Sequence, residues 1–272
     1  MSSNKHCPYH YKVILEYCGA NYFGMQTQND EAIPTIQSEV EKAIALLSPK
    51  KISAFKTAWS GRTDAGVHAM GQVGKISLSL EIPLEGLFMG LNSILPPDIR
   101  LKHIEACPET FHPIRLAKQK TYYYLFTNEK KVTNAFASSF ISNVSFDLDI
   151  QKIHQALKLF EGTHNFQNFY NEGTPVKSTV RTIFEAKMNF VTQQKDHDFG
   201  FMLPKNYYMI QLTGNGFLKQ MIRLIVGHLW SYARGHLSYK QLQDALDGPQ
   251  KLTYKLALVA PPNGLYLAKV DY

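Results

Sequence analysis

The sequence predicts an α+β protein made of two similar halves, residues 1–112 and 113–272. Three observations favour this class. Short β-rich runs alternate with segments of helical periodicity along the whole chain. The same order of strand, loop and helix occurs in both halves, although the residues themselves do not repeat. Finally, 272 residues with 44% hydrophobic content suffice for one large core or two medium ones, and no low-complexity linker is visible.

The first half is expected to begin with a strand, which a polar loop joins to the first helix. Apolar residues recur at helical spacing from Ile36 to Leu47, and Thr35 is the candidate N-cap. A later run from Gln72 to Leu80 has the composition of a strand. The further elements expected in this half are strands at 12–17 and 99–104 and a short helix at 83–91.

The second half is expected to repeat this pattern, starting with an aromatic strand at 121–127. An apolar helical pattern from Ile150 to Phe160 is closed by Gly162, and Ser238 with Gln241 forms a capping box before a final helix. The remaining elements expected here are strands at 184–192 and 207–212, a polar loop at 193–198 and a long apolar helix at 217–232.

The charge balance is compatible with a polyanionic partner. The formal net charge is +7 and the pI is near 9.1, and lysines or arginines placed on phosphates release condensed counterions. Many basic proteins bind no nucleic acid, so this observation alone does not decide the matter.

The cysteines and the N-terminus point to a reducing compartment. Cys7, Cys18 and Cys107 are odd in number and lack the C-x-x-C spacing of a zinc site, so neither a disulfide framework nor a metal centre is indicated. The first residues show no long apolar run and no transit-peptide pattern. We therefore expect a cytoplasmic protein without a membrane span.

The segment Gly61 to Val73 presents one carboxylate, Asp64, on a turn-forming stretch with Arg62 two residues before it. Gly66 can supply a positive φ, and the strand expected from Gln72 would place Asp64 at a strand entrance, where loops often carry chemistry. The alternative from the residues alone is that Asp64 forms an Asx-turn or caps a helix.

This segment closely resembles the signature of the TruA family of tRNA pseudouridine synthases. The match is long and ungapped, and similar stretches recur along essentially the whole chain in the family's order. They are the segments at 16–29, 35–37, 61–69, 71–73, 92–99, 111–112, 120–124, 162–166, 179–183, 217–227 and 264–272.

The resemblance implies both a fold and an activity. The expected fold has two α+β halves whose mixed or antiparallel sheets join into a central sheet, with helices on one side and a basic cleft over Asp64. The expected reaction isomerises uridine to pseudouridine in tRNA, most often at positions 38 to 40 of the anticodon stem-loop. No cofactor or metal is implied, and the expected partners are tRNA and a second copy of the chain in a homodimer.

The resemblance makes Asp64 the catalytic group. It serves either as a nucleophile that forms a covalent sugar intermediate or as a carboxylate that assists departure of the base, and both routes stay open. Arg223 matches the family's arginine that pairs with this aspartate. A charge in so apolar a run would be costly to bury without a partner, although an arginine at a helix edge can also extend to water.

Two further residues match substrate-binding positions of the family. Tyr122 corresponds to the active-site tyrosine, whose ring lies against uracil with its hydroxyl near C5; strand alternation puts Tyr122 and Tyr124 on one face and Tyr123 on the other. Without the family, all three tyrosines read as ordinary β-strand aromatics. Arg62 resembles the arginine that helps to extrude the target nucleotide, and a simple phosphate contact is compatible with this. His68 is expected to support the loop.

Some positions depart from the family pattern and bear on RNA binding. Cys18 stands where the family usually has an acidic residue, Met25 where it has a tryptophan and Thr27 where it has an arginine. Ile114 replaces a second arginine, and Asn165 replaces an aspartate. Arg115 is adjacent to Ile114 and can substitute for the second arginine. The rival hypotheses are a catalytically inactive or retargeted RNA-binding paralogue and a hydrolytic enzyme with carboxylates. The latter usually needs paired acids or a metal cluster, and neither pattern occurs near Asp64.

Overall fold

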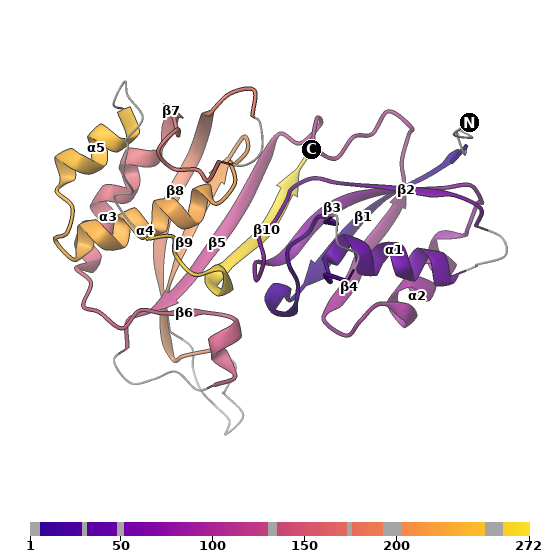
Figure 1. Ribbon diagram of the computed structural model, residues 1–272, viewed down its shortest axis with the longest axis horizontal. Coiled ribbons are helices and arrows are strands. Elements are labelled where there is room, and N and C mark those ends of the chain that lie inside the picture. The colour runs from indigo at the N-terminus through magenta and orange to yellow at the C-terminus, as the bar shows by residue number, and fades with distance from the viewer. Residues whose placement is uncertain are drawn as a thin grey trace. The chain divides into compact units, whose positions relative to one another are not determined.

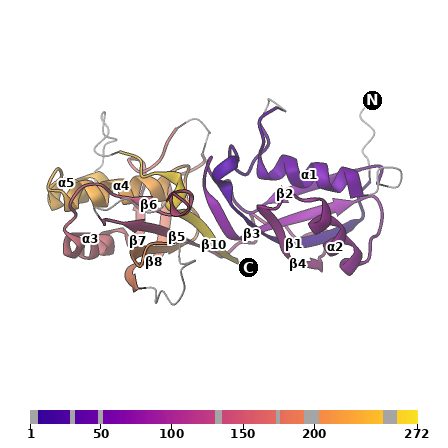
Figure 2. The same ribbon diagram turned by 90° about the horizontal axis from the view of Figure 1, so that it is seen from below.

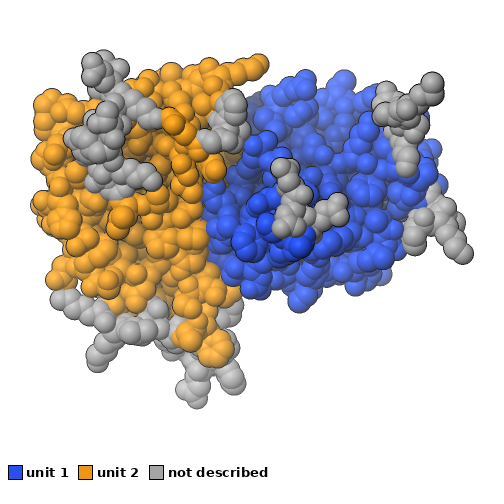
Figure 3. All heavy atoms as spheres, viewed as in Figure 1, with its two compact units in different colours: residues 1–118, 267–272 blue, residues 119–266 orange. Residues whose placement is uncertain are grey.

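The computed structural model describes residues 6–28, 32–47, 52–129, 135–172, 176–192, 203–247 and 258–272. The chain divides into two compact units, residues 1–118 with 267–272 and residues 119–266 (Figure 3). The C-terminal strand thus belongs mainly to the first unit, whereas the sequence placed it in the second half. The predicted loop at 193–198 lies outside the described residues.

The first unit contains a sheet in the order β4-β1-β3-β10, with β2 pairing on β3 (Figure 1). Two helices accompany it, and they contact each other. The core comes from alternation, because every second residue of β1 is buried. The elements are β1 (Tyr9–Tyr17), α1 (Ile36–Leu47), β2 (Phe55–Trp59), β3 (His68–Leu78), α2 (Leu84–Ile94), β4 (Ile99–Ala106) and β10 (Leu265–Asp271).

The second unit contains a sheet in the order β5-β9-β8-β7, with β6 parallel to β5. The pairs β5 with β9, β9 with β8 and β8 with β7 are antiparallel. Helix α3 packs on α4 and on β8, and α5 contacts α4 and β7 (Figures 1 and 2). The elements are β5 (Gln119–Thr127), β6 (Ser142–Asn143), α3 (Ile150–Leu157), β7 (Gly162–Asn165), β8 (Val180–Thr192), β9 (Asn206–Gly214), α4 (Met221–Ala233) and α5 (Tyr239–Asp247).

The predicted α+β class is confirmed, and so are the two helix starts that were predicted from capping residues, at Thr35 and Ser238. Thr35 Oγ1 accepts a hydrogen bond from the Ser38 amide at 3.1 Å at the start of α1. At α5, the Ser238 amide donates to Gln241 Oε1 at 2.9 Å and the Gln241 amide donates to Ser238 Oγ at 3.2 Å. This reciprocal pair is a capping box.

Several predicted boundaries were wrong, each for a local reason. The long helix starts at Met221 and not at 217, because Gln220 has a φ of 59° and cannot extend a right-handed helix. Gly162 begins β7 and does not close α3. Strand β3 starts at His68, and β2 was missed because its five residues alternate only weakly.

Candidate active site

The loop that carries Asp64 is a tight turn between β2 and β3. Gly66 has the positive φ expected from the sequence, 76°, and its amide donates to the Tyr22 carbonyl at 3.2 Å. The Val67 amide donates to the Asp64 carbonyl at 3.1 Å. The Met25 amide donates to the Thr63 carbonyl at 3.1 Å, so the backbone is hydrogen-bonded on both sides of Asp64. Asp64 is half-buried, while Arg62 is exposed.

A second loop, residues 18–25, supports this turn through two glycines. A Cβ on Gly19 would lie 2.0 Å from the Val67 carbonyl oxygen, and one on Gly24 would lie 2.6 Å from the Thr63 carbonyl oxygen. Gly24 also has a φ of 98°. Only glycine permits this close backbone approach, so the two loops form one packed layer.

Buried polar groups fix the ends of the same turn. The Tyr17 hydroxyl and Thr63 Oγ1 are 2.8 Å apart, and burial raises the pKa of Tyr17 to about 12, so this hydroxyl stays neutral at physiological pH. Ser60 Oγ donates to Gln72 Oε1 at 2.7 Å, and Gln72 Nε2 donates to the Gly61 carbonyl at 2.8 Å. The sequence did not single out Ser60 or Gln72 for this role.

His68 has the structural position expected for it. Its side chain is only 1% exposed, and its Nδ1 accepts a hydrogen bond from the Gly19 amide at 3.1 Å. A nitrogen that accepts in this way ties the second loop to the start of β3. His68 is therefore a support for the Asp64 turn.

Tyr122 lies on β5 in the second unit, and the predicted alternation is confirmed. Tyr122 and Tyr124 are buried while Tyr123 is half-buried. The ring of Tyr122 meets the ring of Phe217 edge to face, with centroids 5.2 Å apart. Phe217 lies in the turn before α4, and the sequence did not single it out as a partner of Tyr122.

Arg223 lies on the first turn of α4 and is held by the segment that precedes β10. Its Nε donates to the Ala260 carbonyl at 2.7 Å, and the Ala260 amide donates to the Arg223 carbonyl at 3.1 Å. A Cβ on Gly227, one helical turn later, would lie 1.8 Å from the Leu258 carbonyl oxygen. The guanidinium is thus oriented by backbone and is half-buried.

The charge of Arg223 also acts on its neighbour Tyr124. Burial raises the pKa of Tyr124, and the hydrogen bond to Ser142 and the Arg223 charge oppose this in part. Arg62 and Asp64 belong to the first unit, whereas Tyr122 and Arg223 belong to the second. The pairing of Asp64 with Arg223 therefore stays a prediction.

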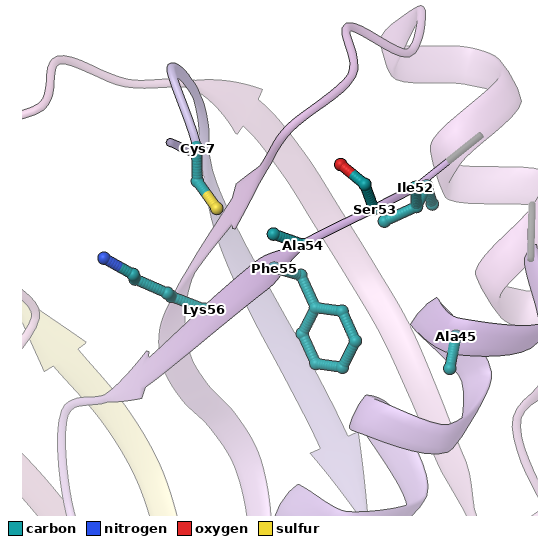
Figure 4. Close-up of a pocket in the computed structure, with 7 residues that line it drawn as sticks. All are labelled: Cys7, Ala45, Ile52, Ser53, Ala54, Phe55 and Lys56. Atoms are coloured by element: carbon teal, nitrogen blue, oxygen red, sulfur yellow. The ribbon is translucent and has the colours of Figure 1, made fainter. Parts of the chain in front are cut away.

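An open hollow in the first unit contains none of the predicted site residues. It has a volume of about 510 Å³, and Figure 4 shows the Cys7 thiol, the Phe55 ring and Lys56 on its wall. Its full lining is Cys7, Ala45, Ile52, Ser53, Ala54, Phe55 and Lys56. The lining contains no carboxylate and no arginine, so the hollow is not the candidate active site.

The described part of the chain contains neither a cluster of metal-ligating side chains nor a helix that could span a membrane. No group of three or more histidine, cysteine, aspartate or glutamate residues within it could hold a metal ion. Within the same residues, no helix combines the length and apolar character that crossing a bilayer requires.

The chain is similar to known proteins over almost its whole length. A family model described as tRNA pseudouridine synthase matches residues 13–115 and 156–272. Proteins named tRNA pseudouridine synthase A are similar over 96% of this chain and 98% of their own length. They come from Thermodesulfovibrio yellowstonii (35% identical), a Thermoanaerobacter species (32%) and the Aster yellows witches'-broom phytoplasma (36%).

Proposed function

The chain belongs to the TruA family of tRNA pseudouridine synthases and is an isomerase that converts uridine to pseudouridine in tRNA, and on this premise we propose its target and the roles of its residues. The target is uridine at positions 38 to 40 of the anticodon stem-loop. The resemblance of the Asp64 segment and of the stretches around Tyr122 and Arg223 to the family supports this assignment.

Asp64 is the catalytic carboxylate. The reaction breaks the bond from C1′ to N1, turns the uracil, joins C1′ to C5 and removes the proton from C5, while N1 gains a proton, so that product and substrate are isomers. Asp64 assists the first step, either by attacking C1′ or by stabilising the positive charge that develops there. The observation that carries this proposal is the rigid turn, whose backbone is hydrogen-bonded on both sides of Asp64 while the carboxylate keeps partial access to solvent.

Arg223 is the cationic partner of the Asp64 carboxylate. Its Nε is engaged by the Ala260 carbonyl, and this hydrogen bond sets the direction of the guanidinium fork. An arginine oriented in this way can present its remaining nitrogens to a carboxylate.

Tyr122 contacts the uracil ring, and its hydroxyl lies near C5 during proton removal. The edge-to-face contact with Phe217 holds the ring in one orientation, which supports this role. Arg62 is exposed beside Asp64, and we assign it to extrusion of the target nucleotide from the stacked RNA.

The protein acts as a cytoplasmic homodimer, in which one protomer grips the tRNA while the other modifies it. Family resemblance supports this assembly. Sedimentation of the protein alone and with tRNA tests it, because a monomer at both stages contradicts the dimer.

Pseudouridine mapping of total RNA from cells with and without this protein tests the target. We expect signals at positions 38 to 40 to disappear without the protein and to return with the wild-type chain. Complementation with Asp64→Asn is the matched control and should not restore them. Restoration by Asp64→Asn would remove Asp64 from the chemistry, and unchanged signals in every tRNA would favour an RNA-binding paralogue.

A further inference from the structure

Two cationic side chains of the second unit lie at the same end of its sheet and on the same face as Tyr122. Lys120 on β5 is paired with Gly214 on β9, and Gly214 is paired with Ile183 on β8. Directly paired residues project to one face, and residues two apart along a strand share that face. Arg181 is two residues before Ile183, and Tyr122 is two residues after Lys120.

The two charges interact where both residues are half-buried. Burial together with the Arg181 charge lowers the pKa of Lys120 to about 8. Burial also lowers the pKa of Arg181. Holding two like charges together costs free energy, and an anion placed between them would remove this cost.

Backbone contacts orient the guanidinium of Arg181. Its Nη1 donates to the Ser178 carbonyl at 2.9 Å and to the Val180 carbonyl at 2.7 Å. Both bonds use the same nitrogen, so the rest of the planar fork keeps one direction. A Cβ on Gly216 would be 3.9 Å from Arg181 Nε, an ordinary contact distance, so the backbone at Gly216 lies next to this guanidinium.

The same corner contains an aromatic surface. A Cβ on Gly214 would lie 3.2 Å from the tip of the Phe217 ring, so this ring rests on the glycine that separates Lys120 from Ile183 in the sheet. Phe217 in turn contacts Tyr122. Two cations beside two aromatic rings match the chemistry of a nucleotide, with phosphate on the cations and a base against the rings.

We propose that Lys120 and Arg181 form a subsite for one backbone phosphate of the substrate RNA, adjacent to the nucleotide that Tyr122 contacts. The position of this phosphate relative to the target rests on the proposed role of Tyr122. The contact sets the register of the RNA and carries no base information.

A scan of neutral phosphates in the RNA tests the subsite. Anticodon stem-loop RNAs carry a single methylphosphonate at each phosphate around the target uridine, and binding is measured for wild type, Lys120→Met and Arg181→Met. Lys42→Met is the control, because it removes an equal charge from an exposed residue on α1 that pairs with Glu39. Lys120→Arg keeps the charge and is the second variant.

For wild type and Lys42→Met, we expect one methylphosphonate position to lower affinity by about tenfold, which is typical of losing a charged hydrogen bond. At that position the loss should be clearly smaller in Lys120→Met and Arg181→Met, because one of the two cations is missing, and should persist in Lys120→Arg. Each of the first two variants should also reduce the slope of log affinity against log salt by about 1, whereas Lys42→Met should not.

The subsite would be overturned if the affinity losses caused by Lys120→Met and Arg181→Met simply added to the loss caused by a methylphosphonate at every position. If Lys120→Met fails to fold, the comparison of wild type with Arg181→Met decides by the same criterion. Pseudouridine formation on the unmodified stem-loop is measured in parallel with wild type. If wild type forms pseudouridine but the effects of variant and methylphosphonate are additive, only the phosphate subsite is contradicted. If wild type forms no pseudouridine, the proposed function itself is contradicted, whatever the scan shows.

Discussion

The two units support their candidate site residues by different means. In the first unit, Asp64 is on an irregular turn whose geometry comes from glycine contacts and buried polar groups. In the second, Tyr122 and Arg223 are on a strand and on a helix, where the regular backbone sets the spacing. A reactive group on a loop thus needs dedicated support, whereas groups on regular elements need only one or two anchoring contacts.

The largest effect should come from the reacting group on the turn. Asp64→Asn keeps the shape of the side chain and removes its charge, so single-turnover pseudouridine formation on an anticodon stem-loop should fall by at least about 100-fold, roughly 3 kcal/mol. Melting temperature and RNA affinity should stay close to wild type. Turnover above a few percent of wild type would show that the turn does not carry the catalytic group.

The next effect concerns the charge on the helix. Arg223→Met removes the proposed counter-charge and the bond to Ala260, and it should lower activity by about 100-fold. Arg223→Lys should retain part of the activity, because the charge survives and the planar fork does not. Single-turnover rates of both variants measure this. Equal rates for wild type and Arg223→Met would break the proposed pair.

A third prediction distinguishes the contribution of the Tyr122 ring from that of its hydroxyl group. Tyr122→Phe keeps the contact with Phe217 and should fold and bind RNA as wild type does. The reaction should stall after base departure or at proton removal from C5, because only the hydroxyl is lost. Rapid-quench analysis of the products detects the stall. Wild-type turnover would instead restrict Tyr122 to stacking.

Because the Asp64 turn depends on close contact between two loops, two glycine substitutions in the first unit should change the free energy of unfolding differently. Gly19→Ala places a Cβ 2.0 Å from the Val67 carbonyl and should lower the free energy of unfolding by about 2 to 4 kcal/mol and reduce activity. Gly86→Ala on α2 meets nothing within 4 Å and should raise stability by about 0.5 to 1 kcal/mol. Denaturant unfolding of both variants measures this. Equal effects would contradict the packed layer of loops.

The pH dependence of stability tests the cation beside Tyr122. The pKa of Lys120 falls from an ordinary value of 10.5 to about 8 in the folded chain. Between these values the unfolded chain binds more protons, so the free energy of unfolding should rise with pH in this window. The gain is up to roughly 3 kcal/mol in wild type and should be absent in Lys120→Met. Denaturant unfolding at pH 7 and pH 10 measures it, and equal gains in both proteins would contradict the buried charge.

The class of fold, the family and most of the regular elements could be predicted from the amino-acid sequence. Alternation and helical spacing are local properties, so β1, α1, β5 and α5 follow from them, and the caps at Thr35 and Ser238 are short-range hydrogen bonds. The turn around Asp64 was also visible, because a positive φ at Gly66 is a property of one residue.

The residues that support the site could not be predicted from the sequence and are known from the folded structure. The approach of Gly19 to Val67 and the link from Ser60 through Gln72 to Gly61 join segments that the sequence does not relate. The same holds for the grouping of residues 267–272 with the first unit and for the shared sheet corner of Lys120 and Arg181. Such contacts depend on packing between distant segments, and periodicity carries no information about them.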